Sequence, residues 1–177
     1  ARLVERLLSE PPAGVELVGQ ILPVSFARSA ATIDAALRAL GARRPALLFS
    51  MGVSRMDPYF RLERRAGTRY HSTRADNDGV TGGELCFPDG ERLTELALEP
   101  LAAVLERFSG QPVLLSENAG GYVCEGVYHH ILELGAGLGI PALFLHVPRS
   151  ELVAVELQVP AVRGLLGLTR DRSGASR

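Results

Sequence analysis

The segment PVLLSENAGGYVCEGVYHHIL, residues 112–132, contains the connection that decides the fold. It opens on the continuous apolar run Val113–Leu115, which predicts a short buried strand. Gly120 and Gly121 follow, and two glycines permit a tight turn with a close approach of the backbone. Residues from about 122 to 134 have the apolar spacing of a helix. A strand, a glycine turn and a helix form the repeating unit of an α/β protein.

Other stretches extend this alternation in both directions. Helical spacing is present at the N-terminus, at residues 32–40 before Gly41, and at residues 93–108 with Pro100 near a helix start. A last helix is expected to have Pro160 at its first position. Strands are expected at residues 15–26, ending near Pro23, and at residues 45–52, 57–65 and 142–147. A glycine turn is expected at residues 135–139, and residues 66–90 predict a long polar loop.

The order of these elements predicts a three-layer α/β/α sandwich with a largely parallel central sheet. Residues 1–169 are expected to form one peptidase-like domain, with residues 170–177 as a disordered tail. The chain begins at Ala1, without a methionine, and opens directly on the helical pattern. The expected fold therefore leaves room for a further N-terminal strand upstream of this sequence.

Composition excludes several classes of protein. The formal net charge of −1 offers no electrostatic basis for binding nucleic acid or an anionic membrane. No apolar run approaches the roughly 20 residues that a membrane-spanning helix requires. The two cysteines, Cys86 and Cys124, are too few for a disulfide framework. The expected setting is the cytoplasm.

Cys124 is the first candidate for chemistry. After the glycine turn it falls in the first turn of the predicted helix, where unpaired N–H groups and the helix dipole favour a thiolate. The same N–H groups could help to stabilise an oxyanion. The alternative is that Cys124 is a small buried apolar residue, and its position leaves the two interpretations evenly matched.

His146 and Glu63 are further candidates because each lies at or near the end of a predicted strand. Ligands of open α/β sheets bind outside the carboxyl ends of the strands. An imidazole beside a thiol can activate it, and a carboxylate can orient the imidazole. Each residue also has an ordinary interpretation, as a structural histidine and as a member of a solvated ion-pair surface among arginines.

The remaining histidines do not predict a metal site. His71 lies in the polar loop, and the neighbours His129 and His130 cannot share one helix face. Cys86 is far from all of them in sequence, so the spacing of metal ligands is absent. We expect neither a metal nor a cofactor.

Two motifs carry a resemblance to a known family. The run SENAGGYVC at residues 116–124 is followed by ALFLHVP at residues 142–148, and together they resemble pyroglutamyl peptidase I, the pyrrolidone-carboxylate peptidase family of cysteine peptidases. Upstream, ILPVSF at residues 21–26 is similar to the family's early strand. Residues 51–55 then lead to Leu62-Glu63-Arg64, which is similar to the family's Glu-Arg element.

The resemblance implies removal of an N-terminal 5-oxoproline from peptides. It implies that Cys124 attacks the carbonyl of the lactam residue, that His146 acts as base and then acid, and that Glu63 orients His146. By the same resemblance Arg74 lies near the oxyanion site, and Tyr122 and Val123 contact the lactam. Family members are often homo-oligomers.

One family element has no counterpart here. The family's first strand ends in Gly-Phe-Glu-Pro-Phe-Gly, whose aromatic rings clasp the pyrrolidone. Either the chain continues upstream of Ala1, or the pocket has diverged. Two alternatives to a pyroglutamyl peptidase therefore remain: a related cysteine amidase with another acyl specificity, and an inactive binding domain of the same fold.

Overall fold

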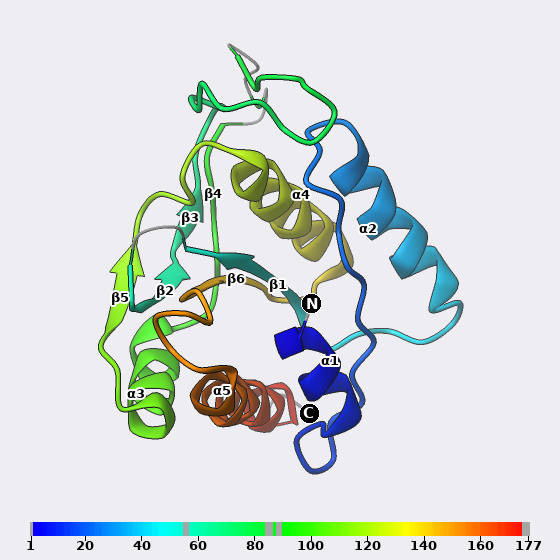
Figure 1. Cartoon of the computed structure of the whole chain (residues 1–177). Coiled ribbons are helices and arrows are strands. Elements are labelled where there is room, and N and C mark those ends of the chain that lie inside the picture. Colours follow the sequence, from blue (N-terminus) through cyan, green and yellow to red (C-terminus); the bar gives the residue numbers. More distant parts are fainter. Residues whose placement is uncertain (1, 55–56, 84–86, 88–89, 175–177) are drawn as a thin grey trace.

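The computed structural model describes residues 2–54, 57–83, 87 and 90–174, with side chains to residue 169. The described chain forms a layered α/β structure, as predicted (Figure 1). Ala1, Arg55 and Cys86 lie outside the described residues.

The central sheet has the strand order β1-β6-β2-β5. Its strands are β1 (Leu48–Val53), β6 (Ala142–Val147), β2 (Phe60–Glu63) and β5 (Val113–Ser116). The pairs β1–β6 and β2–β5 are parallel, whereas β2 and β6 are antiparallel. The sheet is therefore mostly parallel, with one reversal of direction at its centre.

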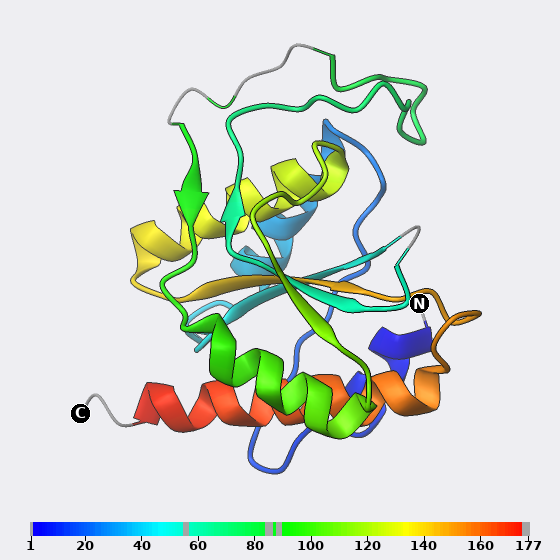
Figure 2. The same cartoon turned by 90° about the vertical axis from the view of Figure 1, so that its left-hand side faces the viewer.

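Helices cover both faces of this sheet. On one side lie α1 (Arg2–Ser9), α3 (Leu98–Ser109) and α5 (Val155–Gly174), and on the other lie α2 (Arg28–Ala39) and α4 (Val123–Leu138) (Figures 1 and 2). A short ribbon of β3 (Arg65–Ala66) and β4 (Arg92–Leu93) stands beside α4. The three predicted layers are confirmed.

Strand alternation divides the side chains between two cores. Phe60 and Leu62 of β2 join Leu143 and Leu145 of β6 in the core beneath α3 and α5. Phe144 points to the opposite face and packs with residues of α4. Since successive side chains of a strand point to opposite faces, Arg61, Glu63 and His146 lie on the α4 side. That side carries the candidate site.

The strand predicted at residues 15–26 is wrong. These residues form no strand, although Leu17 packs against the first core and Leu22 and Phe26 against the second. The segment connects α1 on one face of the sheet with α2 on the other, and within the described residues it pairs with no strand of the sheet. Its apolar residues are explained by that packing.

Three predicted boundaries near helices are also wrong. Pro160 lies inside α5, because the helix begins at Val155. The glycines at 135 and 137 do not form a turn, and α4 continues to Leu138 before Gly139 ends it in the left-handed conformation. The predicted tail begins too early, since α5 extends to Gly174, while residues 175–177 lie outside the described residues.

Candidate active site

The structure brings together the three residues that the sequence singled out. His146 lies in β6, Glu63 ends β2, and Cys124 occupies the first turn of α4. The His146 Nδ1 atom is 2.7 Å from Glu63 Oε1. On its other side the imidazole lies beside the Cys124 thiol, which influences its protonation. Thiol, imidazole and carboxylate therefore lie in one series, in which a hydrogen bond joins the imidazole to the carboxylate.

The reason for the His146–Glu63 contact differs from the predicted one. Strand ends were expected to meet at one edge of the sheet, but β2 and β6 run in opposite directions. In their pairing Arg61 is opposite His146 and Glu63 is opposite Phe144. Glu63 and His146 are therefore diagonal cross-strand neighbours on one face, a separation that long side chains can span.

The backbone before Cys124 follows the glycine turn that the sequence predicted. Gly120 and Gly121 have φ angles of 97° and 62°, in the region that favours glycine. Tyr122 has extended backbone and precedes the first helical residue, Val123. Cys124 is half-buried at a helix N-terminus, where the helix dipole stabilises a thiolate.

The environment of His146 favours its protonated form. Burial lowers the pKa of the imidazole, but hydrogen bonds with Cys124 and Glu63, together with their negative charges, raise the pKa to about 9. A pKa above the ordinary value of 6.5 means that the ring holds a proton at neutral pH. The site therefore holds a protonated imidazole beside the Cys124 thiol.

Glu63 is completely buried, and its position is held by several groups. Oε1 receives hydrogen bonds from His146 and from Arg61 Nη2, the latter at 3.2 Å. The hydroxyl of Tyr128 donates to the Glu63 carbonyl oxygen at 2.7 Å. Burial, and then the Glu63 charge, raise the pKa of Tyr128, so the phenol remains a donor.

Glu125 is a component of the site that the sequence analysis missed. The residue is 2% exposed, and its carboxylate accepts the Gly121 N–H at 2.8 Å and the Gly67 N–H. It therefore holds the turn before Cys124 against the chain that follows β3. In sequence Glu125 resembles any acidic residue in a first helical turn, so its role could not be recognised.

Gly52 is a second missed component. It pairs with His146 in the parallel register of β1 and β6. A Cβ atom at this position would lie 3.0 Å from Cys124 Sγ, 3.0 Å from Phe144 Cζ and 3.1 Å from His146 Cδ2. The missing side chain therefore leaves the space that the thiol and the imidazole occupy.

The residues predicted to bind substrate lie beside the nucleophile turn. The Tyr122 hydroxyl donates to the Ala75 carbonyl at 2.9 Å, and the Arg74 guanidinium lies 5.1 Å from the centre of the Tyr122 ring. Val123 is buried in the α4 core. Arg74 itself is exposed. The guanidinium thus rests over the tyrosine two residues before Cys124, and the predicted oxyanion role of Arg74 stays a prediction.

The other histidines have separate environments. The His71 ring packs against Gly121, and the backbone N–H of His71 donates to the Gly121 carbonyl at 3.0 Å. His129 Nε2 lies 2.9 Å from the Gly90 carbonyl, and His130 Nε2 lies 2.7 Å from Asp34 Oδ1 on α2. Within the described residues no group of three or more His, Cys, Asp or Glu side chains is placed to hold a metal.

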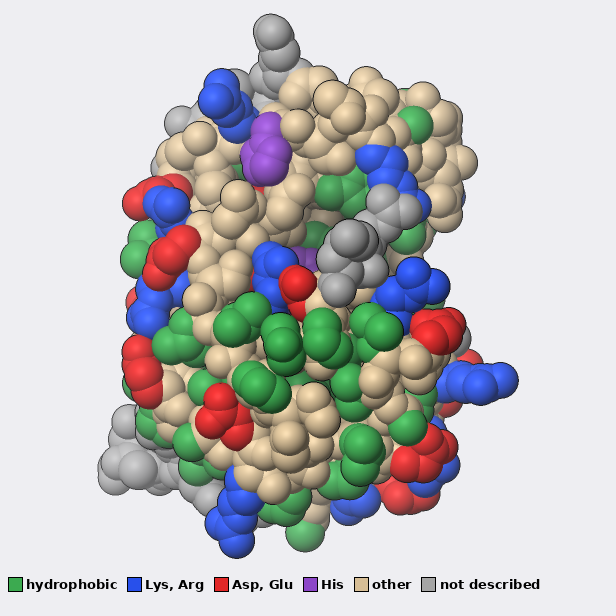
Figure 3. Space-filling model, turned by 60° about the vertical axis from the view of Figure 1, so that its left-hand side comes forward, with side chains coloured by type: hydrophobic (Ala, Val, Ile, Leu, Met, Phe, Trp, Pro, Cys, Tyr) green, Lys and Arg blue, Asp and Glu red, His purple; other side chains and the backbone are tan. Residues whose placement is uncertain are grey.

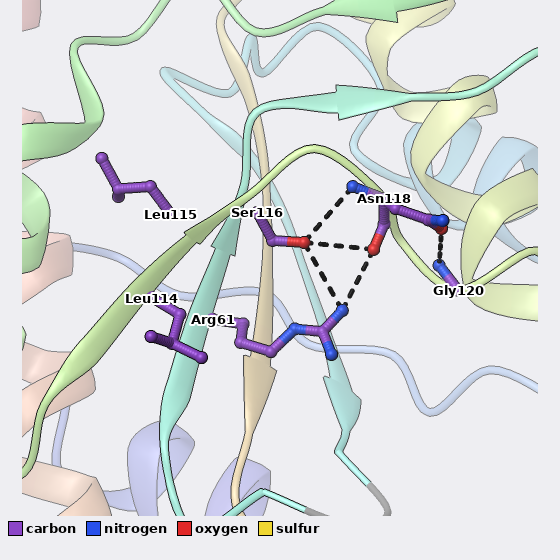
Figure 4. A pocket seen from close by; sticks show the side chains of 6 residues that line it. All are labelled: Arg61, Leu114, Leu115, Ser116, Asn118 and Gly120. Carbon is purple, nitrogen blue, oxygen red and sulfur yellow. Dashed lines mark hydrogen bonds between the residues drawn. The ribbon is translucent and has the colours of Figure 1, made fainter.

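An open pocket lies beside this chain of residues. Its lining consists of Arg61, Leu114, Leu115, Ser116, Asn118 and Gly120 (Figure 4). The surface on this side is hollowed, with basic and acidic side chains at the hollow and apolar side chains below it (Figure 3). The pocket thus borders both β2 and the loop that leads to Cys124.

A thiol at a helix start, paired with an imidazole and a buried carboxylate on an α/β sandwich, defines the class of cysteine-type hydrolases. The chain is 30% identical over 161 residues to the pyrrolidone-carboxylate peptidase of Thermococcus onnurineus, an alignment that covers 89% of this chain and 79% of the relative. It is 33% identical over 160 residues to that of Deinococcus radiodurans, with coverage of 87% and 71%. The chain belongs to the pyrrolidone-carboxylate peptidase family.

Solved structures agree with this assignment. The pyrrolidone carboxyl peptidase of Fervidobacterium islandicum superposes with a TM-score of 0.85 at 26% identity, covering 96% of this chain and 89% of that one. The Thermococcus litoralis protein has the same fold, with a TM-score of 0.87 at 20% identity and coverage of 99% and 87%. A scan against family models found no match.

Proposed function

We propose that this protein is a cysteine exopeptidase that removes pyroglutamate (5-oxoproline) from the N-terminus of peptides, with Cys124 as nucleophile, His146 as base and acid, and Glu63 as the group that orients His146. The observation that carries the proposal is the series Cys124, His146 and Glu63, in which the imidazole lies beside the thiol and contacts the carboxylate at 2.7 Å, in a member of this family. A thiol, an imidazole and a carboxylate in this order are the components of acyl transfer.

The chemistry begins with the thiolate. Cys124 Sγ attacks the carbonyl carbon between the pyroglutamyl residue and the next residue, forming a tetrahedral oxyanion. The N-terminal N–H groups of α4 and the Arg74 guanidinium are the proposed donors to that oxyanion. As the C–N bond breaks, the His146 imidazolium gives its proton to the departing amine, leaving a thioester at Cys124.

The second half of the reaction restores the enzyme. The now neutral His146 takes a proton from water, and the resulting hydroxide attacks the thioester carbonyl. The Cys124 thiolate leaves, which releases free pyroglutamate and regenerates the thiolate–imidazolium pair. Throughout both halves Glu63 holds Nδ1 of the imidazole, so that the other ring nitrogen faces the thiol.

Substrate contacts come from residues next to the nucleophile. Tyr122 and Val123 are proposed to contact the lactam ring, because they directly precede Cys124 at the start of α4. The expected substrates are peptides with N-terminal pyroglutamate, and the expected compartment is the cytoplasm. Separately, no helix among the described residues has the length and hydropathy to span a membrane. A homo-oligomer remains a prediction, which light scattering of the purified protein tests.

The test is release of a fluorophore from a pyroglutamyl amide. Wild-type protein is expected to hydrolyse pyroglutamyl-aminomethylcoumarin, whereas Cys124→Ser and Cys124→Ala are expected to lose activity by more than about a thousandfold. A panel of other N-acyl and aminoacyl amides serves as the comparison. Full activity in Cys124→Ser would exclude the mechanism. Hydrolysis of the panel without preference for pyroglutamate would instead identify a broader cysteine amidase.

A further inference from the structure

Arg61 is a charged residue that the proposed mechanism leaves unused. In the antiparallel pairing it lies directly opposite His146, and it shares a strand face with Glu63. Its side chain is only 25% exposed. Arg61 Nη2 donates to Glu63 Oε1 at 3.2 Å, and the same oxygen lies 2.7 Å from His146 Nδ1. One carboxylate oxygen thus binds both a guanidinium and the candidate catalytic imidazole.

The same guanidinium also holds the loop that leads to Cys124. Nη2 donates to the Asn118 carbonyl at 3.0 Å and lies 3.5 Å from Ser116 Oγ (Figure 4). On the other side, Nη1 lies 3.3 Å from Asp57 Oδ2 in the segment before β2. Arg61 therefore links the orienting carboxylate with the loop from β5 to α4, which presents the nucleophile.

The charged groups around His146 come from several elements. Helix α4 contributes Cys124 and, near Glu63, the phenol of Tyr128. Strand β2 contributes Glu63 and Arg61, and Asp57 is bound to Arg61. The facing residue of β1 is Gly52, which carries no charge. A guanidinium in contact with Glu63 favours the deprotonated form of every titrating group nearby.

We propose that Arg61 is a positioning residue with two roles. It sets the pH range in which the Cys124–His146 pair is ionised, and it fixes the position of Glu63 relative to the loop from β5 to α4. Arg61 lowers the pH at which the thiolate forms, and its bonds to Asn118 and Ser116 keep that loop in place. The inference rests on the proposed function for its catalytic readout, but the state of the thiol can be measured without any substrate.

Three variants separate charge from geometry. Arg61→Met removes both the charge and the bonds, and Arg61→Lys keeps the charge without the paired donors. Arg65→Met is the matched control, because Arg65 Nε donates to the Glu117 carbonyl of the same loop at 2.9 Å, while its ion pairs are with Glu91 and Glu117. Circular dichroism and thermal melting establish that each variant is folded. Should Arg61→Met fail to fold, Arg61→Gln replaces it with the same expectation.

Two pH profiles are measured for each variant. The first is kcat/KM for pyroglutamyl-aminomethylcoumarin, and the second is the rate at which iodoacetamide alkylates Cys124, followed by mass spectrometry of its peptide. In Arg61→Met we expect both profiles to move upward by on the order of half a pH unit. We also expect kcat to fall about tenfold while KM changes by less than about twofold. Arg61→Lys restores the pH profiles but not kcat.

The outcomes are distinct. An unchanged alkylation profile in Arg61→Met, or an equal shift in Arg65→Met, would overturn the role of Arg61. A shift that Arg61→Lys reverses supports it. If even the wild type fails to hydrolyse pyroglutamyl amides, the proposed function is refuted, and the alkylation profiles still decide whether Arg61 controls the thiol.

Discussion

Gly52 and His146 lie side by side in the parallel pair β1–β6, and the absence of a side chain at Gly52 is what allows the imidazole and the Cys124 thiol to approach each other. A methyl group there would lie 3.0 Å from Cys124 Sγ, a separation that real Cβ contacts essentially never fall below. The other close neighbours are the Phe144 and His146 rings. The candidate site therefore depends on a residue of the neighbouring strand β1 that has no side chain.

Replacing Gly52 with alanine is expected to damage activity more than stability. The added methyl pushes the Cys124 thiol away from His146, and misplacement of reacting groups by about 1 Å costs on the order of a hundredfold in rate. The measurement is kcat/KM together with the unfolding midpoint in denaturant. Gly137→Ala is the matched control, because its added Cβ meets no atom within 4 Å. Equal activities for the two variants would show that Gly52 has no role in the site.

The pH dependence of activity is expected to follow His146. Its pKa of about 9 lies above the ordinary value, so the proton needed by the departing amine is lost above about pH 9 and activity declines there. Protonated His146 also stabilises the fold. This contribution to the free energy of unfolding is fully present below pH 6.5 and is lost as the pH rises to about 9.

Glu63→Gln is expected to lower the pH at which activity declines on the alkaline side of the pH profile. The substitution removes a negative charge that raises the pKa of His146. The rate should also fall by about 10²- to 10⁴-fold, since the amide no longer favours the required tautomer and no longer stabilises the imidazolium. The measurement is kcat/KM from pH 5 to 10. A limb that stays in place in Glu63→Gln would show that another group controls it.

Glu125 is expected to support both stability and activity. Glu125→Ala leaves the buried Gly121 N–H and the partly buried Gly67 N–H without their acceptor, and a buried unpaired donor costs about 1–3 kcal/mol. The turn before Cys124 then loosens, so kcat should fall as well. Urea unfolding and kcat together provide the test, with the exposed Glu133→Ala on the same helix as the control. Similar unfolding free energies for both variants would contradict this account.

Arg74 is expected to stabilise the oxyanion only after its guanidinium moves away from the Tyr122 ring. If its guanidinium donates to the oxyanion, Arg74→Met should lower kcat by about 10²- to 10³-fold with little effect on folding. Arg69→Met, at another exposed arginine of the same loop, is the control. A rise in KM with an unchanged kcat would assign Arg74 to substrate binding, with no part in the stabilisation of the oxyanion.

Local pattern was sufficient for most elements and for the three candidate residues. Apolar periodicity located β1, β5, β6 and α4, and the glycine turn directed attention to Cys124. These signals are contained within short windows of sequence, where side-chain spacing directly reflects backbone geometry. The same local signals failed at residues 15–26, because a strand also needs a partner with free backbone groups, and no local pattern supplies that information.

The missed residues depend on register between distant segments. Gly52 matters because β1 pairs with β6, and Arg61 matters because β2 runs antiparallel to β6. Glu125 matters because the chain after β3 returns to the start of α4. None of these relationships leaves a periodic trace, so each required the three-dimensional arrangement.

The alternation along β2 has one more consequence. Phe60 and Leu62 fill the core on one face, while Arg61 and Glu63 enter the site on the other. A slip of one residue would exchange the two faces, burying charges among leucines and withdrawing the carboxylate from His146. Misregistered molecules would thus be inactive as well as unstable. In a refolding experiment the recovered activity should therefore be proportional to the fraction of molecules with the native β2 register, because molecules with the wrong register contribute no activity.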